Sequence, residues 1–169
     1  MPDVYPQTSP HKPIIGWKEW VTLPDLGIPA VKAKIDTGAR TSALHAFTLE
    51  PFRREGRQMV RFGVHPLQRR RDVVRTCEAV VLDYRQVKNS GGQIEERYVI
   101  HTCLGLGDLD WSIDLTLTNR SGMRFRMLLG RTAVRGRLVV DPGKAYLYGR
   151  LRAKAYGVAR SSSKRKKVS

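Results

Sequence analysis

Hydrophobic and polar residues alternate in many short stretches of the chain, separated by turns rich in Gly, Pro, Asp and Asn. Alternation with a period of two is typical of strands that bury one face. Many short strands, with at most one short helix near residues 131–136, predict an all-β fold, either a small closed barrel or a sandwich. The expected strands lie at residues 14–24, 31–36, 42–49, 59–64, 77–84, 95–100, 111–118 and 123–129, with a last hairpin at 138–148.

The strand at 31–36 leads directly into Asp36, Thr37 and Gly38. Glycine allows a sharp turn and leaves its N–H accessible, so this sequence predicts a carboxylate held at a strand end by its own loop. The simpler interpretation is an ordinary turn, because Asp, Thr and Gly all favour turns. The hydrophobic strand before Asp36 and the downstream segment Met127-Leu128-Leu129-Gly130-Arg131 favour the first interpretation.

Several separated motifs resemble one family of bacterial and archaeal proteins. They are Lys34 to Ala46, Leu117 to Arg120, Met127 to Arg131 and Val140 to Pro142, within about residues 14–150. The family is often labelled "ATP-dependent zinc protease" and is now viewed as retropepsin-like. Some members are linked to the ligase that adds glutamates to a ribosomal protein. The resemblance implies a small closed barrel of the acid-protease type, one lobe per chain, at 14–150. Residues 1–13 contain four prolines and no periodicity, which indicates a flexible lead, and the basic composition of 151–169 indicates a disordered tail.

The same resemblance implies an aspartic endopeptidase, with Asp36, Thr37 and Gly38 as catalytic residues. Peptide hydrolysis by carboxylates needs two of them sharing one proton. The chain has one Asp-Thr-Gly, whereas Asp83 and Asp141 follow hydrophobic residues without that turn and are interpreted as structural. The resemblance therefore implies a homodimer in which the two copies of Asp36 meet and activate a water molecule, and in which the monomer is inactive.

Charge is the strongest signal in the composition. Thirty-one Lys and Arg against fifteen Asp and Glu give a formal net charge of +16. Such a field attracts nucleic acid, membrane surfaces or acidic peptides. Arginine pairs well with carboxylates, so we expect an acidic peptide or a glutamate-tailed protein as substrate. The candidate substrate-binding residues are Arg40, Arg85, Arg97, Arg120 and Arg131.

Two further segments carry specific expectations. A hairpin tip at 88–93 is a candidate flap over the site, with Asn89, Ser90, Gly91 and Gly92 at its bend; the alternative is an ordinary exposed hairpin. Trp17 and Trp20 are expected to supply aromatic packing to the core. His45 is expected to be packed or hydrogen-bonded near the site rather than to act as a base.

The other functional classes have weaker support in the sequence. A metallopeptidase would need a motif such as His-Glu-x-x-His or Cys-x-x-Cys, and ATP use would need a phosphate-binding loop; neither occurs, so no cofactor is expected. The alternative function is a binding module that contacts RNA or the ribosome through the basic tail.

Length and composition indicate the number of domains and the expected cellular location. The chain of 169 residues suits one domain, and its two cysteines do not indicate a disulfide framework. No apolar run approaches the roughly 20 residues of a membrane helix. We therefore expect a cytoplasmic protein without a membrane partner.

Overall fold

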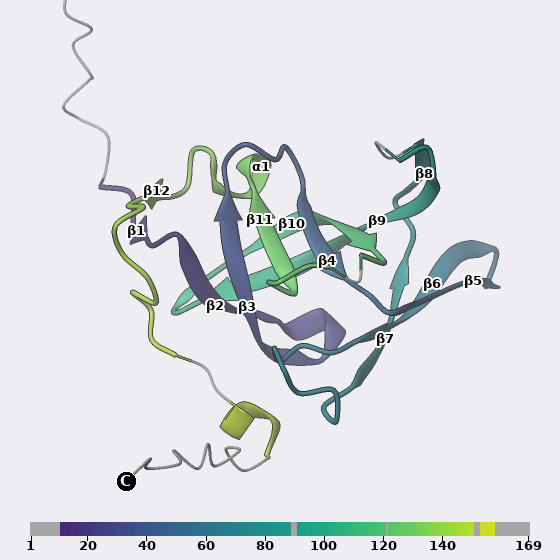
Figure 1. The fold of residues 1–169 in the computed structure, drawn as a ribbon, viewed down its shortest axis with the longest axis horizontal. Helices are drawn as coiled ribbons and strands as arrows, with labels where there is room; N and C mark the ends of the chain where they lie inside the picture. The colour runs from purple at the N-terminus through teal and green to yellow at the C-terminus, as the bar shows by residue number, and fades with distance from the viewer. Residues whose placement is uncertain (1–10, 89–90, 121, 151–152, 158–169) are drawn as a thin grey trace, which may run out of the picture.

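The computed structural model describes residues 11–88, 91–120, 122–150 and 153–157 (Figure 1). Strands dominate, and the only α-helix in the described residues is a single turn, α1 (Arg131–Val134). Two 3-10 helices are η1 (Pro24–Leu26) and η2 (Ala153–Tyr156). The strands are β1 (Ile14–Ile15), β2 (Lys18–Leu23), β3 (Ile28–Asp36), β4 (Ser42–His45), β5 (Thr48–Arg54), β6 (Arg57–Val64), β7 (Arg75–Val80), β8 (Asp83–Lys88), β9 (Ile94–Leu106), β10 (Leu109–Thr118), β11 (Met127–Gly130) and β12 (Val139–Val140).

Six strands close into a barrel in the order β10-β4-β11-β3-β2-β9, because β10 also pairs with β9. β8 adds to the outer edge of β9. The barrel interior is filled by fully buried aliphatic side chains, including Leu44, Ile100, Leu115 and Leu129. The predicted all-β closed barrel is confirmed.

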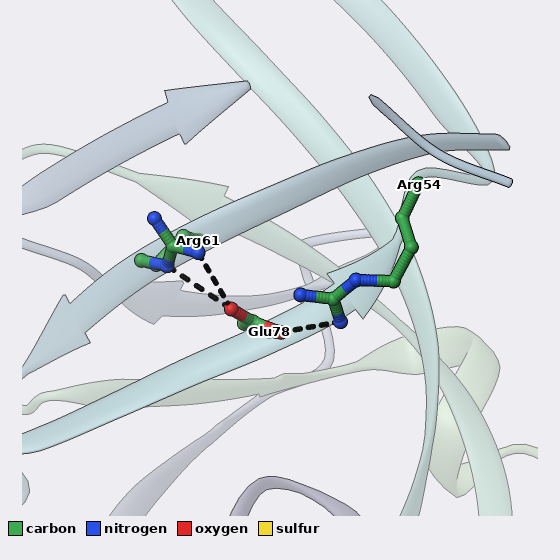
Figure 2. A network of polar contacts seen from close by, with 3 residues as sticks. All are labelled: Arg54, Arg61 and Glu78. Carbon is green, nitrogen blue, oxygen red and sulfur yellow. Dashed lines mark hydrogen bonds and ion pairs between the residues drawn. The ribbon is translucent and has the colours of Figure 1, made fainter. Parts of the chain in front are cut away.

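A separate sheet of three antiparallel strands, β5-β6-β7, extends from one side of the barrel (Figure 1). Glu78 of β7 accepts hydrogen bonds from Arg54 of β5 at 2.8 Å and from Arg61 of β6 at 2.9–3.0 Å, so one carboxylate bridges all three strands (Figure 2). The hydrogen bonds from Arg54 and Arg61 hold the pKa of Glu78 below its ordinary value. Ion pairs this exposed contribute little to stability, so they orient the sheet rather than hold it together.

The boundaries of several predicted strands were wrong. The stretch 42–49 is broken at Ala46 and Phe47, where the chain leaves the barrel for the side sheet. Residues 50–56, expected from their polar composition to form a turn, instead continue as β5 up to Arg54, and the turn is confined to Glu55 and Gly56, both with positive φ. The stretch 77–84 belongs to two strands: β7 pairs with β6, and only β8 pairs with β9. A continuous alternating pattern therefore hid two places where the chain changes sheet.

The predicted hairpin at 138–148 was also wrong, because β12 pairs in parallel with β1. The segment after β12 runs beside β2, where Lys144 O accepts the N–H of Trp17 and Lys18 O accepts the N–H of Tyr146. Further on, the hydroxyl of Tyr156 bonds to the backbone of Ala30 in β3, and burial raises its pKa to about 12. The structure thus places residues 153–157, within the stretch expected to be a disordered tail; residues 158–169 lie outside the described residues.

β2 does not bury the tryptophans that were expected in the core. Glu19, Val21 and Leu23 point into the protein and are buried, whereas Lys18 and Trp20 lie on the outer face. Trp17 is likewise only partly buried. The expectation that both tryptophans fill the core was wrong: Trp20 lies on the face of β2 opposite to the inward positions, and Trp17, which precedes the strand, is only partly buried.

None of the helices in the described residues has the length and apolar character needed to cross a membrane.

Candidate active site

Asp36 is the last residue of β3, and it lies opposite Gly130 in the parallel pairing with β11. Its Oδ1 atom accepts hydrogen bonds from the backbone N–H groups of Gly38 and Ala39, both at 3.1 Å. Its other oxygen forms no hydrogen bond within the described residues. The loop therefore fixes the carboxylate through one oxygen and leaves the second one available to a ligand.

The start of α1 is tied to the Asp36 loop by backbone bonds. Arg131 N donates to Ala39 O at 2.7 Å, and the N–H and hydroxyl of Thr132 both donate to Arg40 O. The guanidinium of Arg131 also donates to Thr37 O at 3.2 Å. These bonds connect two segments more than 90 residues apart, so the loop geometry depends on β11 and α1 as well as on its own turn residues.

Gly130 is required by the close crossing of β11 and the start of β4. A Cβ atom at this position would lie 2.5 Å from the carbonyl carbon of Thr41, closer than real contacts allow. Its N–H donates to the buried hydroxyl of Ser42 at 3.0 Å. The predicted association between the Leu128-Leu129-Gly130 strand and the Asp-Thr-Gly loop is therefore observed as direct packing.

A groove of about 590 Å³ begins beside this loop and runs over β4, β10 and β11 toward β8 and β9. Ala39, Arg40 and Thr41 line its end next to Asp36. The carboxylates of Asp83 and Asp114 also line the groove. The remaining lining residues are Ala43, Leu82, Arg85, Arg97, Val99, Thr116, Thr118, Arg120, Leu128 and Thr132.

Most of the groove's charges have partners, but two do not. Asp83 accepts from Arg85 at 2.8 Å, and Asp114 bonds His101 at 2.8 Å. Arg97 lies near Glu95, at 3.4 Å. The guanidinium groups of Arg40 and Arg120, by contrast, form no hydrogen bond or ion pair with any described residue. The groove therefore keeps two uncompensated positive charges for a ligand.

The structure brings together four of the five arginines predicted for substrate binding: Arg40, Arg85, Arg97 and Arg120 all line the groove. Arg131 does not line it and instead braces Thr37. The threonines at 41, 116, 118 and 132 were not proposed as site residues. The signal for two of them was present, because Thr116 and Thr118 occupy the polar face of an alternating strand.

The candidate flap is only partly described. Gly91 and Gly92 lie in the turn between β8 and β9, and Gly92 has a φ of 80°. Asn89 and Ser90 lie outside the described residues. β8 and β9 contribute Arg85 and Arg97 to the groove, opposite one another in register, so this hairpin borders the site.

His45 is buried at the end of β4 and connects to the groove through the backbone. Its Nδ1 atom accepts the N–H of Arg120 at 3.2 Å, which requires that nitrogen to be unprotonated. Burial, together with the nearby positive charge of Arg126, lowers the pKa of His45. His45 is therefore a packed, hydrogen-bonding residue, and no geometry here gives it the role of a base.

Stability should fall on acidification because of His45. Its folded pKa lies below the ordinary value of about 6.5, so below that pH the unfolded chain binds the proton more readily, at up to about 1.4 kcal/mol per pH unit for one proton. We expect His45→Gln, which keeps an acceptor without a charge, to flatten the loss between pH 7 and pH 5. Urea unfolding at four pH values measures the difference, and parallel curves for the two proteins would contradict it.

Among the described residues, no three His, Cys, Asp or Glu side chains are grouped so as to hold a metal ion together. Cys77 is buried, donates to Leu26 O, and has its pKa raised to about 11 by burial. It is a packing residue rather than a reactive thiol.

The chain is similar in sequence to curated proteins. Curated relatives named "Probable alpha-L-glutamate ligase" share 48% identity over 141 residues in Shewanella halifaxensis and 52% over 142 residues in Parasynechococcus marenigrum. These alignments cover 83% and 84% of this chain but 31% and 30% of the relatives, so the chain spans about a third of their length.

A solved structure is also similar to this chain. The crystal structure of Lpg0085 from Legionella pneumophila, a protein described as having unknown function, has a TM-score of 0.68 and 27% identity. The match covers 82% of this chain and 99% of that one.

A protein-family model described as "RimB-like: Retropepsin-like aspartic endopeptidase RimB" matches residues 14–150. That region holds the whole barrel, the Asp36 loop and the Gly130 crossing, and it confirms the resemblance drawn from the motifs. The chain belongs to the RimB-like family of retropepsin-like aspartic endopeptidases.

Proposed function

We propose that this protein is an aspartic endopeptidase whose active form contains two copies of the chain, each contributing Asp36. The observation that carries the proposal is the geometry of Asp36 at the end of a strand that pairs with β11 at Gly130. One carboxylate oxygen is fixed by Gly38 and Ala39, and the other has no hydrogen-bond partner among the residues that the structure describes. A rigid carboxylate with one free oxygen is what a water-activating group needs.

The second carboxylate is proposed to come from another copy because the chain's other candidates are engaged elsewhere. Asp83 bonds Arg85. Asp141 accepts the N–H of Gly143 at 2.9 Å within its own turn. Neither Asp83 nor Asp141 is followed by Thr-Gly as Asp36 is, so a twofold dimer is the simplest source of the pair.

In the proposed reaction the two copies of Asp36 share one proton, because like charges so close cannot both be ionised. The ionised carboxylate takes a proton from water, and the resulting hydroxide attacks the peptide carbonyl carbon. The protonated carboxyl donates a hydrogen bond to the carbonyl oxygen. The C–N bond then breaks, and a proton passes to the leaving amine.

The proposed substrate is an acidic peptide, in particular a run of glutamates. The guanidinium groups of Arg40 and Arg120 have no partner among the described residues, and both line the groove. Arg85 and Arg97, which are paired with Asp83 and Glu95, line the same groove from the β8–β9 hairpin. The relatives are named as glutamate ligases, which fits a substrate rich in glutamate. We also propose that the β8–β9 hairpin acts as the flap over this substrate.

The direct test is cleavage of a synthetic peptide ending in several glutamates by the purified protein, with products identified by mass spectrometry. Cleavage that is unchanged by a chelator supports the proposal. Cleavage that the chelator abolishes would contradict it in favour of a metal-dependent reaction, and absence of cleavage would remove the glutamate-rich substrate.

Replacing Arg40 and Arg120 by Gln should weaken the binding of acidic peptides. A charge-assisted hydrogen bond contributes about 1.5–3 kcal/mol, so we expect KM to rise about 10-fold or more for each residue, with a smaller change in kcat. The matched control is Arg53→Gln, an exposed arginine in β5 of the side sheet. Equal KM values for the groove variants and the control would contradict the assigned role.

A further inference from the structure

The outer face of β2 and β3 gathers aromatic and basic side chains away from the groove. Trp17, Lys18 and Trp20 come from β2 and the residue before it, Lys32 comes from β3, and Tyr146 and Arg150 come from the segment after β12. We call these six residues the aromatic–basic surface. The segment that supplies Tyr146 is fixed beside β2 by the bond from Tyr146 N to Lys18 O.

Cations and rings interleave on this surface. Lys18 Nζ lies 4.5 Å from the centroid of Trp17 and 5.0 Å from that of Tyr146. Lys32 Nζ lies 5.4 Å from Trp20 and 5.7 Å from Tyr146, and Arg150 Cζ lies 4.7 Å from Tyr146. Three cations thus surround one tyrosine ring, and each attraction of this kind is weak at an exposed site.

The positive charge on this face is not neutralised by the protein. Lys18 lies directly opposite Lys34 in the β2–β3 pairing, and like charges in that position are destabilising. Within the described residues, none of Lys18, Lys32, Lys34 and Arg150 forms an ion pair. Lys32 donates a hydrogen bond to the neutral side chain of Gln68. Glu19, the acid of β2, points into the interior.

We infer that the aromatic–basic surface binds single-stranded nucleic acid, with Lys18, Lys32 and Arg150 contacting phosphates and the rings of Trp17, Trp20 and Tyr146 stacking with bases. Proteins that bind single strands combine a cationic track with aromatic platforms in this way. An acidic peptide would satisfy the lysines, but it has no flat rings to occupy the aromatic side chains. This inference is independent of the proposed peptidase activity and uses none of the groove residues.

The test is fluorescence anisotropy of a labelled 12-nucleotide oligouridylate with the full chain. In Lys18→Gln/Lys32→Gln we expect at least a 10-fold loss of affinity at 50 mM salt. The slope of log K against log salt should be smaller in magnitude by about 1.4, since each of the two lost phosphate contacts on a single strand contributes about 0.7. The matched control is Arg53→Gln/Arg57→Gln, which removes the same charge from the β5–β6 hairpin. An equal loss in the control would overturn the inference, because bulk charge would then explain binding.

A second measurement tests stacking. Trp111 donates to Ala133 O and lies apart from this surface, so Trp111→Phe leaves Trp17 and Trp20 as the remaining tryptophans. We expect oligouridylate to quench their fluorescence, and Trp20→Leu to lower affinity about 10-fold. Undetectable binding, or binding without quenching, would overturn the inference. Equal affinity of the aromatic–basic surface for a 12-residue oligoglutamate would overturn it too.

Discussion

Replacing Asp36 by Asn is expected to lower peptide cleavage by the roughly 100- to 10,000-fold that a positioned acid–base group contributes. The amide oxygen of Asn can still accept the N–H groups of Gly38 and Ala39, so the loop should keep its shape. The amide cannot take a proton from water, however, and the shared proton of the carboxylate pair is lost. Initial rates on a glutamate-tailed peptide measure the effect.

The matched control for this experiment is Asp141→Asn. Asp141 also accepts a backbone N–H two residues ahead, from Gly143, so the same chemical change is made in a similar turn remote from the groove. We expect the control to cleave at the wild-type rate. Sedimentation of Asp36→Asn should show the same association state as the wild type, and an undiminished rate in this variant would remove Asp36 from the mechanism.

The part of the site that could be predicted from sequence is the part that rests on local chemistry. Asp36 ends an alternating strand, and Asp36, Thr37 and Gly38 are residue types that favour turns. Gly130 was identifiable because it ends a short hydrophobic run, whereas the reason for the glycine, the lack of space for a Cβ atom, comes from the structure. Family resemblance supplied the pairing of these two segments, which spacing alone does not reveal.

The part that could not be predicted depends on contacts between distant segments. The alternation over 77–84 continues through the point where β7 leaves the side sheet and β8 joins the barrel, so hydrophobic pattern gives no sign of the break. β12 pairs in parallel with β1, more than 120 residues away, where a Pro-Gly turn favoured a local hairpin. Local pattern reports which face of a strand is buried but not which strand it pairs with.

β2 shows the same limit at a single residue. Trp17 and Trp20 were expected inside because aromatic side chains carry large apolar area, and Glu19 carries a charge that usually remains exposed. The structure instead buries Glu19 completely and leaves both tryptophans only partly buried. Glu19 can be buried because its carboxylate accepts three backbone N–H groups, and buried charges persist only where hydrogen bonds compensate them.

Glu19→Ala is expected to destabilise the protein by about 3 kcal/mol. Glu19 Oε2 accepts the N–H groups of Gly16 at 2.7 Å and Leu147 at 3.2 Å, and Oε1 accepts that of Tyr148 at 3.4 Å. Alanine leaves these three groups without this acceptor and opens a cavity. Urea unfolding measures the loss, with Glu19→Gln as a variant of similar shape that should lose less because one oxygen remains.

The same variant links stability to the segment after β12. Because Glu19 holds Leu147 and Tyr148 against β2, its removal should speed hydrogen exchange at these two amides more than at barrel amides such as that of Leu129. Uniform acceleration across the barrel would show that Glu19 supports the fold generally rather than anchoring this segment. Since the segment also carries Tyr146 and Arg150, selective loosening would predict weaker binding at the aromatic–basic surface without any change in the charge of that surface.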